Sequence, residues 1–382
     1  MRTVPKQDGR CRLWPANRTN SLERRDAPEF KGLKIGDSAG WSRRPTMSLE
    51  PIDPETALEL YLDDRENNVT EATLYSHRSR IGHFIRWCDE NDITNLNTLT
   101  GRQLHEYRIW RRNEGDLAPA TEKTQMDTLR VWIKWLEAID AVKQDLHTKV
   151  LSPTLTGDDN VRHEKVDPDR AEEILAYLEK YEYASRPHVA LELMWHTMMR
   201  VGEIRSLDVP DYDPGNQSMQ VKHRPGTGTT LKNQSKGERF VALSDRVCGV
   251  LDDWIELRRP DVTDDHSREP LIATSQGRVH TTTLRGDCYR FTRPCVVTRD
   301  CPHDRDIETC DATGYDNPSG CPSSLNPHAF RRGGITHALQ EGWPMKAVGD
   351  RANVSETVLS MHYDSRTEEE KMEQRRKYLD DL

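Results

Sequence analysis

The sequence predicts a mainly α-helical protein with a small β-sheet, built as a helical domain followed by an α+β domain. Its 382 residues are too many for one ordinary domain. Apolar residues recur at helical spacing over about residues 53–142, whereas the second half adds short β candidates between helical stretches. With 34% hydrophobic and 31% charged residues the composition is globular, and no apolar run approaches the ~18 residues of a membrane helix.

Residues 1–46 are expected to form a disordered basic extension. They hold eleven Lys and Arg against five acidic residues, with little apolar periodicity. Met47 is an alternative start, and a basic DNA-binding arm is the alternative interpretation of this segment. No apolar stretch follows the first charges, so the N-terminus does not predict a secretory signal. We therefore expect a cytoplasmic protein whose eight cysteines are thiols or metal ligands.

A helical domain is predicted for residues 47–145. Its first long helix should begin after the N-cap Thr70 and end near Asn91, with apolar positions at Leu74, Ile81, Phe84, Ile85 and Cys88. A second helix holds Tyr107 and Trp110, and a third begins near Pro119, a residue favoured in a first turn. The first helix also carries basic side chains, which are either a solvated face or a DNA-binding surface: His77, Arg78, Arg80, His83 and Arg86.

The second domain is expected at residues 167–382, after an irregular polar linker at 146–166. Helical stretches are predicted over residues 168–182, 187–207, 245–258, 281–291, 328–341 and 355–377. Short strands are predicted at 218–222, 229–232 and 239–243, with Pro and Gly supplying the turns between them.

Three short motifs in this second domain carry chemically active residue types. In TMMRVGEIRSL, Arg200 and Glu203 are three residues apart and share a helix face. In PHAFRRGGIT, His328 and Arg331 project to one side of a helix, and about thirty residues later MHYD carries Tyr363. Each motif alone is ordinary, because an Arg–Glu helix pair is usually a surface salt bridge and a lone Tyr usually packs. Only their order within one domain is specific.

In that order the chain resembles the tyrosine recombinase, or phage integrase, family. The family's first motif runs Thr-Gly-x-Arg-x-x-Glu-Leu, where this chain reads TMMRVGEI with Met198 in place of Gly; its second runs His-x-x-Arg before small residues and Thr, here HAFRRGGIT. The resemblance covers roughly residues 53–382. It implies a SAM-like core-binding domain at 47–145 that clamps DNA, and a catalytic domain at 167–382.

The family also places a lysine in a β-hairpin turn before a segment like Arg-x-Val-Pro-Leu. The stretch TTLKNQSKGERFVAL fits this context, with Lys232 as the preferred residue and Lys236 as the competitor. A Gly-His pair usually precedes the tyrosine by about ten residues, but here the stretch is GDRANV and the spacing is longer. Asp350 or Arg351 is the candidate for that position, so the residue that takes the role of the family's histidine is in doubt.

The resemblance implies a site-specific recombinase that cleaves and rejoins DNA through a 3′-phosphotyrosine. Arg200 and Arg331 can grip the nonbridging oxygens with forked donors. Tyrosine has a free pKa of ~10, so Tyr363 needs a positive pocket and His328 as proton acceptor or hydrogen-bond partner. The resemblance assigns protonation of the departing 5′ oxygen to Lys232. It implies no catalytic cofactor, a double-stranded DNA recombination site as partner and a tetramer on DNA.

The net charge of −9 is unusual for a DNA-binding protein. Since residues 1–46 are basic, the acidic excess lies in the rest of the chain, where the basic residues are mainly Arg. An acid-rich, Lys-poor surface suggests a salt-loving host, in which phosphate contacts lose much of their strength. We therefore expect an archaeal, haloarchaeal member of the family.

A cysteine-rich insertion is predicted at residues 295–321, just before the His-x-x-Arg motif. It holds Cys295, Cys301, Cys310 and Cys321, with His303 among them, and four such ligands can make a structural zinc site. The spacing is not a paired Cys-x-x-Cys, and the alternative is a set of reduced cysteines.

Two rival functions remain beside the recombinase: a type IB topoisomerase-like enzyme, and a DNA-binding protein that has lost catalytic activity.

Overall fold

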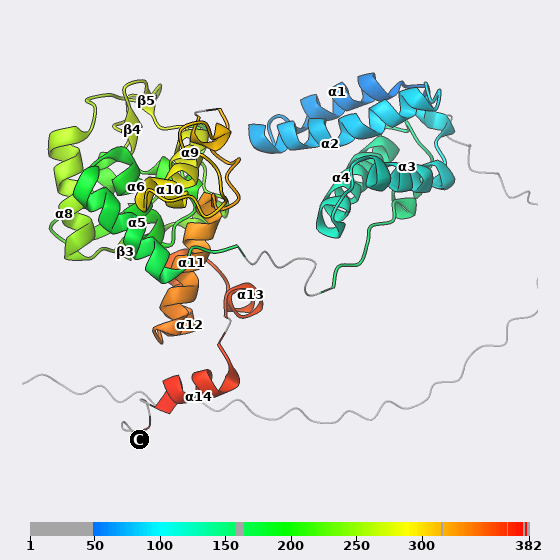
Figure 1. Cartoon of the computed structure of the whole chain (residues 1–382). Helices are drawn as coiled ribbons and strands as arrows, with labels where there is room; N and C mark the ends of the chain where they lie inside the picture. Colours follow the sequence, from blue (N-terminus) through cyan, green and yellow to red (C-terminus); the bar gives the residue numbers. More distant parts are fainter. Residues whose placement is uncertain (1–48, 157–163, 315, 365, 377–378, 380–382) are drawn as a thin grey trace, which may run out of the picture. The chain divides into compact units, whose positions relative to one another are not determined.

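The computed structural model describes residues 49–156, 164–314, 316–364, 366–376 and 379, in two compact units that divide after Pro153 (Figure 1). The predicted extension at 1–46 lies outside the described residues. No helix in the described part of the chain is both long and apolar enough to cross a membrane.

The first unit is all helical, as predicted. Its elements are α1 (Pro54–Arg65), α2 (Glu71–Glu90), η1 (Leu96–Thr98), α3 (Gly101–Glu114), α4 (Pro119–Ala138) and η2 (Leu146–Lys149). The Thr70 hydroxyl accepts from the backbone N of Thr73 and caps α2, which ends before Asn91; α4 begins at Pro119. These three boundaries confirm the predictions from capping residues. Residues 146–150, in the stretch predicted as a linker, pack on this unit through η2.

Aromatic rings fill the centre of this unit. The Phe84 ring meets Tyr107 edge-on at a centroid distance of 4.9 Å and Trp132 at 5.7 Å, and all three are buried. Two of the basic side chains on α2 form ion pairs within the unit: Arg78 with Glu59 at 2.5 Å, and Arg86 with Glu114 at 2.8 Å. Their charges are therefore partly balanced at the surface.

The second unit packs helices around a small antiparallel sheet. Its helices are α5 (Pro168–Tyr181), α6 (Arg186–Thr197), α7 (Val201–Ser206), α8 (Asp245–Asp253), α9 (Thr281–Phe291), α10 (Pro294–Val297), α11 (Pro327–Gln340), α12 (Met345–Ala352), α13 (Glu356–His362) and α14 (Glu368–Arg376), with single turns η4 (Val209–Asp211), η5 (Gln234–Gly237), η6 (Trp254–Arg258) and η7 (Asp311–Thr313). The strands are β1 (Tyr212–Asp213), β2 (Ser218–Val221), β3 (Arg239–Ala242), β4 (Ala273–Thr274) and β5 (Gly277–Arg278).

The three-stranded sheet has the order β1-β2-β3, and β4 pairs with β5 separately. Met219 in β2 lies opposite Tyr212 in β1 and Val241 in β3, and all three side chains are buried in the main core of the unit. A second, smaller core lies among α11, α12 and α13 and includes Met198, Leu359 and Tyr363. Figure 1 draws these three helices in orange to red at one end of the unit.

Three predicted elements of this unit differ from the structure: two helices are each broken in two, and one strand is absent. The predicted helix 187–207 is broken into α6 and α7, because Met198 has φ 56°, in the left-handed region. The predicted strand 229–232 is absent: a lone bridge joins Thr229 to Arg224, and a turn leads into η5. The predicted helix 355–377 is two helices, α13 and α14, separated after His362, and α12 was not predicted.

Candidate active site

A buried carboxylate, Glu203, gathers three arginines at the heart of the candidate site. Its side chain is 2% exposed. Arg200 donates to Oε1 at 3.1 Å, Arg239 donates to Oε2 at 3.1 Å, and Nη1 of Arg331 lies 3.9 Å from Oε2. Burial alone would raise the pKa of Glu203, but Arg239, the backbone amide of Arg200 and the charge of Arg331 together hold it below the usual value. Three guanidiniums around one carboxylate leave an excess of positive charge suited to a phosphate.

Arg200 owes its place to the break between α6 and α7. The chain turns at Met198, and Arg200 becomes the N-cap of α7, where its backbone N donates to Glu203 Oε2 at 2.7 Å. Its Nη2 also donates to the carbonyl of Asn353 at 3.1 Å. The guanidinium is thus fixed from two sides although the side chain is 25% exposed.

Arg331 is buried in the first turns of α11, with 1% of its surface exposed. It donates to the backbone carbonyl of Met198, and its Nη2 donates to the carbonyl of Ala352 at 2.7 Å. Burial, and then the charge of Arg200, lowers the pKa of Arg331 to about 10, so it stays cationic at neutral pH. One side chain therefore ties together the end of α6, the start of α7 and the end of α12.

His328 lies one turn before Arg331 in α11 but is exposed. Pro327 occupies the first helical position, and Asn326 Oδ1 caps the helix by accepting from the backbone N of His328 at 2.9 Å. His328 is therefore exposed on the same helix that carries the buried Arg331.

Tyr363 ends α13 as its C-cap and is 8% exposed. Thr336 donates to its backbone carbonyl at 3.3 Å, and the guanidinium of Arg332 lies 5.3 Å from the centre of its ring. Burial lowers the pKa of Arg331, and a negative charge on the Tyr363 phenol would act in the opposite direction. The structure thus brings Tyr363 into the same small core as Met198 and beside two arginines of α11.

Both candidate lysines are exposed on the connection between β2 and β3. Lys232 stands in the turn after Leu231, not at the end of a strand, and Lys236 lies in η5. Next to Lys232, Asn233 Nδ2 donates to Asn353 Oδ1 at 3.2 Å. This contact attaches the Lys232 turn to the residue whose carbonyl binds Arg200.

Of the two candidates for the sixth position, only the backbone of Arg351 contacts the arginine cluster: its carbonyl accepts from Arg239 Nε at 2.8 Å. Asp350 is exposed and pairs with Lys346 at 2.5 Å. Arg351 donates to the carbonyls of His196, at 2.7 and 3.0 Å, and of Ala242, at 2.9 Å, so it braces α12 against α6 and β3. The residue that meets Arg200 in this part of the chain is Asn353.

Residues 164–369, more than half of the chain, match the sequence profile described as the Phage integrase family. The chain belongs to this family. The tyrosine recombinase XerD of Staphylococcus epidermidis is 27% identical over 318 residues, which cover 80% of this chain and 94% of that protein. The tyrosine recombinase XerC of Corynebacterium glutamicum is 22% identical over 311 residues, covering 80% and 86%.

Two solved integrases share the fold. The Tn1549 transposon integrase in complex with a circular intermediate DNA superposes with a TM-score of 0.60 at 16% identity, covering 86% of this chain and 99% of that chain. A lambda integrase dimer bound to a core site gives 0.55 at 15% identity, covering 84% and 97%. Membership of the phage integrase family carries its reaction, the site-specific breaking and rejoining of DNA through a covalent tyrosine intermediate.

Two residues of this integrase site were missed by sequence reasoning. Arg239 opens the Arg-x-Val segment that located the lysine, so the signal was present, but nothing local shows that the side chain reaches Glu203. Asn353 carried a weaker signal: an Asn just after a helix favours the left-handed conformation that it adopts here, with φ 52°.

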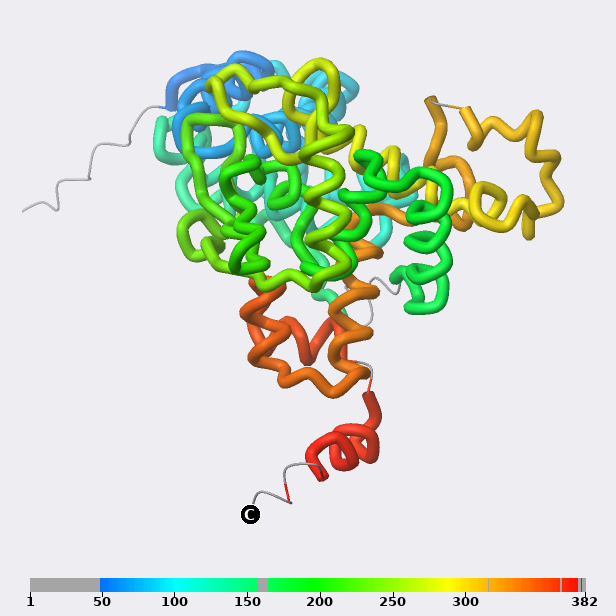
Figure 2. Tube along the Cα trace, turned by 90° about the vertical axis from the view of Figure 1, so that its left-hand side faces the viewer, coloured from blue at the N-terminus to red at the C-terminus, as the bar shows by residue number. Residues whose placement is uncertain are grey.

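The cysteine-rich segment 295–321 forms a loop with short helical turns α10 and η7, drawn in yellow to orange in Figure 2. Burial raises the pKa of the Cys295 thiol; the charge of Arg293 opposes this increase, and Cys321, Cys301 and Cys310 add to it. Among the residues that the structure describes, however, no three His, Cys, Asp or Glu side chains are grouped so that they could hold a metal ion. The arrangement described here does not fit a zinc ion.

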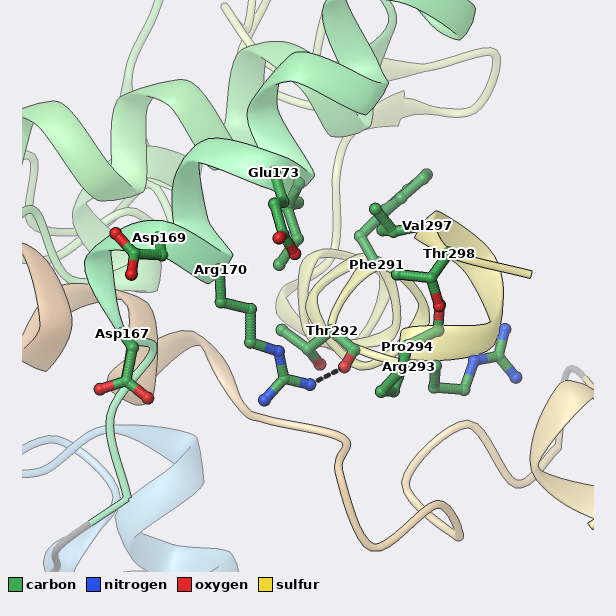
Figure 3. A pocket seen from close by; sticks show the side chains of 11 residues that line it. Asp167, Asp169, Arg170, Glu173, Phe291, Thr292, Arg293, Pro294, Val297 and Thr298 are labelled. Carbon is green, nitrogen blue, oxygen red and sulfur yellow. Dashed lines mark hydrogen bonds between the residues drawn. The ribbon is translucent and has the colours of Figure 1, made fainter. Parts of the chain in front are cut away.

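A pocket lies beside this segment, between the start of α5 and the corner of α9 and α10 (Figure 3). Arg170 reaches across it and donates to the carbonyl of Thr292, and at 2.8 Å to that of Ser323. Asp167 and Asp169 lie on the α5 side. Arg170 therefore anchors the segment to α5, and none of the residues that surround Glu203 lines this pocket.

Proposed function

We propose that Tyr363 is the nucleophile of the recombination reaction. Its oxygen attacks the scissile phosphorus and forms the phosphotyrosine bond, while the bond from phosphorus to the 5′ oxygen breaks. The phenolic proton passes to His328, and the leaving 5′ oxygen takes a proton from Lys232. Arg200 and Arg331 hold the nonbridging oxygens and stabilise the charge that builds on them.

The observation that carries this proposal is the convergence of three arginines on Glu203 with Tyr363 nearby. Residues from α7, β3 and α11 meet there although they are far apart in the sequence. A phosphodiester resists attack because its oxygens are negative, so a buried excess of guanidinium charge is what the reaction needs. The stored phosphotyrosine bond then allows rejoining without an external energy source.

A nicked suicide substrate tests the nucleophile. The substrate is built from an attachment repeat flanking the gene, and the covalent adduct is scored on a denaturing gel. Tyr363→Phe removes one oxygen, so it should bind DNA normally and form no adduct. Tyr378, which lies outside the described residues, is the matched control, and Tyr378→Phe should keep the adduct. The reverse pattern would assign the reaction to Tyr378, and no adduct in the wild type or in either variant would favour an inactive DNA-binding protein.

We also propose that the integrase works as a tetramer on DNA and that its C-terminal segment couples the protomers. Helix α14 has no buried residue, and Met372 is 49% exposed. The helix is held to its own unit by polar contacts: Gln374 donates to the carbonyls of Leu339, at 3.3 Å, and Gln340, at 2.8 Å. Such contacts can be exchanged for those of a neighbour at little cost. Deleting 368–382 should spare DNA binding by one protomer and abolish strand exchange; normal exchange would contradict this role.

The proposal assigns a separate function to each of the two domains. The helical residues 47–145 are the core-binding domain and residues 167–382 the catalytic domain, with the DNA site held by both. The double-stranded recombination site is the partner. We place the protein in the cytoplasm, where that DNA lies.

The acidic, Lys-poor composition supports a haloarchaeal type, for which cleavage by the purified protein should survive molar salt.

A structural zinc remains a proposal for the cysteine-rich segment and requires it to rearrange around the ion. Its support is the clustering of Cys295, Cys301, Cys310 and Cys321 within 27 positions of the sequence. Metal analysis of the purified protein should give about one zinc per chain, and changing Cys301 and Cys310 together to Ser should remove it. Full activity and stability without metal would leave the cysteines as reduced thiols.

A further inference from the structure

We propose that Asn353 is a positioning residue that couples the Lys232 turn to the Arg200 guanidinium. The inference rests on the proposed role of Lys232 as the proton donor to the leaving oxygen. Asn353 makes one contact to each side: its backbone carbonyl accepts from Arg200 Nη2 at 3.1 Å, and its side-chain Oδ1 accepts from Asn233 Nδ2 at 3.2 Å. Asn233 directly follows Lys232 in the sequence.

The connection that carries Lys232 needs such a support. It runs from β2 to β3 without a strand of its own, and Lys232 and Asn233 are exposed within it. Gly237, where the connection returns to β3, lies against the same amide: a Cβ built on it would come within 3.0 Å of Asn353 Nδ2. Both ends of the Lys232–Gly237 segment therefore rest on Asn353.

Stability alone does not explain an asparagine at this position. The residue is left-handed, with φ 52°, a conformation that glycine adopts without cost. Its Nδ2 is buried and finds no hydrogen-bond partner among the described residues, which also disfavours the folded state. Glycine would remove both costs and keep the carbonyl contact with Arg200, so the amide is there for the contact that it makes with the lysine turn.

The chemical consequence concerns one proton. When the bond from phosphorus to the 5′ oxygen breaks, that oxygen takes the proton of Lys232 Nζ, so the ammonium must lie within hydrogen-bond reach of it. Arg200 grips the nonbridging oxygens of the same phosphate. By joining the lysine turn to Arg200, Asn353 fixes the distance between the guanidinium that binds the phosphate and the Lys232 ammonium that donates the proton.

The test compares two leaving groups in Asn353→Gly. On normal DNA, single-turnover cleavage should fall about tenfold, a part of the ~10²–10⁴-fold that proton transfer contributes. On a substrate whose bridging 5′ oxygen is replaced by sulfur, cleavage should return to the wild-type rate, because a thiolate leaves without a proton. The melting temperature should not fall. A variant equally slow on both substrates, or unimpaired on normal DNA, would overturn the inference.

Three further variants make the comparison decisive. Asn233→Ala should share the defect and the rescue, and combining it with Asn353→Gly should add nothing. Lys346→Ala, which breaks an exposed ion pair on the preceding helix, should leave both rates unchanged. Lys232→Ala should be rescued by sulfur in the same way. If sulfur rescues Lys232→Ala but not Asn353→Gly, the inference is wrong and the role of Lys232 stands; if it rescues neither, the role of Lys232 is wrong and the inference falls with it.

Discussion

The arginine cluster and the proton-transfer groups of the site differ in how firmly the protein holds them. Arg331 is 1% exposed and bonded to two backbone carbonyls, and Arg200 is fixed by Glu203 and by a carbonyl. His328 and Lys232, by contrast, are exposed to solvent. The fold itself therefore fixes the arginines that we propose bind the phosphate, whereas the groups that we propose transfer protons are exposed. Four experiments probe this contrast, beginning with the largest expected effect.

Removing either guanidinium should cripple cleavage without abolishing DNA binding. Arg331→Ala and Arg200→Ala each delete a guanidinium that we propose stabilises the developing charge, an effect worth about 3 kcal/mol, or roughly a hundredfold or more in rate. Arg331→Ala should also lower stability, because the carbonyls of Met198 and Ala352 lose their buried donor. Single-turnover cleavage and urea unfolding measure the two effects separately. Equal stability losses in both variants would contradict the difference in burial.

Glu203→Gln should cost both stability and activity. Breaking a buried pair leaves cations uncompensated, at about 3 kcal/mol. Because its folded pKa is lowered, Glu203 stabilises the fold above the ordinary carboxyl pKa and loses this contribution as the pH falls. The stability difference between wild type and variant should therefore be largest near neutral pH and shrink in acid.

The matched control for Glu203 is another buried carboxylate of the same unit. Glu192 on α6 pairs with Arg246 and His196, each at 2.9 Å. Burial would raise its pKa, but these partners and His188 lower it to about 2. Glu192→Gln should lose stability in the same way, over the window from about pH 4 down to about pH 2, yet folded protein should cleave at the wild-type rate. A cleavage defect as large as that of Glu203→Gln would show that Glu203 affects cleavage only through stability, as any buried carboxylate of this unit would.

His328→Ala should slow cleavage by about a hundredfold, the lower end of what a positioned proton acceptor contributes. Since the imidazole is exposed, the urea midpoint should stay where it is in the wild type. A large loss of stability would show that the histidine is structural, and unchanged cleavage would pass the role of proton acceptor to another group.

Met198→Gly should have the smallest effect. Glycine relieves a left-handed backbone worth about 1 kcal/mol, but it also removes a side chain that is 4% exposed, at a cost of about 2 kcal/mol or more. The two contributions have opposite signs, and burial is the larger, so we expect a net loss of about 1–2 kcal/mol. A gain in the urea midpoint would mean that backbone strain dominates.

The same contrast explains what could be predicted from the sequence. Motif order and spacing, with the family resemblance, singled out Arg200, His328, Arg331 and Tyr363 as candidates, and these residues can be read from the sequence alone. Capping residues such as Thr70 and Pro119 marked helix starts correctly. The break at Met198 carried no such signal, since methionine is an ordinary helix former and nothing local forces it into the left-handed region.

The missed parts of the site depend on tertiary contacts. Arg239 in β3 reaches Glu203 in α7 across 36 positions of the sequence, and Asn353 meets Arg200 across 153 positions. The strand predicted at 229–232 failed for a related reason: Gly226 and Gly228 both have positive φ, so the preceding chain bends and does not extend into a hairpin. Long-range packing decides the contacts of Arg239 and Asn353, whereas the glycines act locally.

The two glycines after Arg331 have a consequence for reading mutational data. A Cβ on Gly333 would lie 2.2 Å from the carbonyl O of Val166 and 2.7 Å from the Trp195 ring, and one on Gly334 would lie 2.6 Å from the carbonyl O of Trp195. Helix α11 therefore rests directly on the backbone of α6, and this approach sets the gap between Arg331 and Arg200. In a saturation screen scored by recombination, alanine at either glycine would score as badly as a lost catalytic group, because it would force α11 away from its neighbours. Abundance measured alongside activity would identify them as spacing residues.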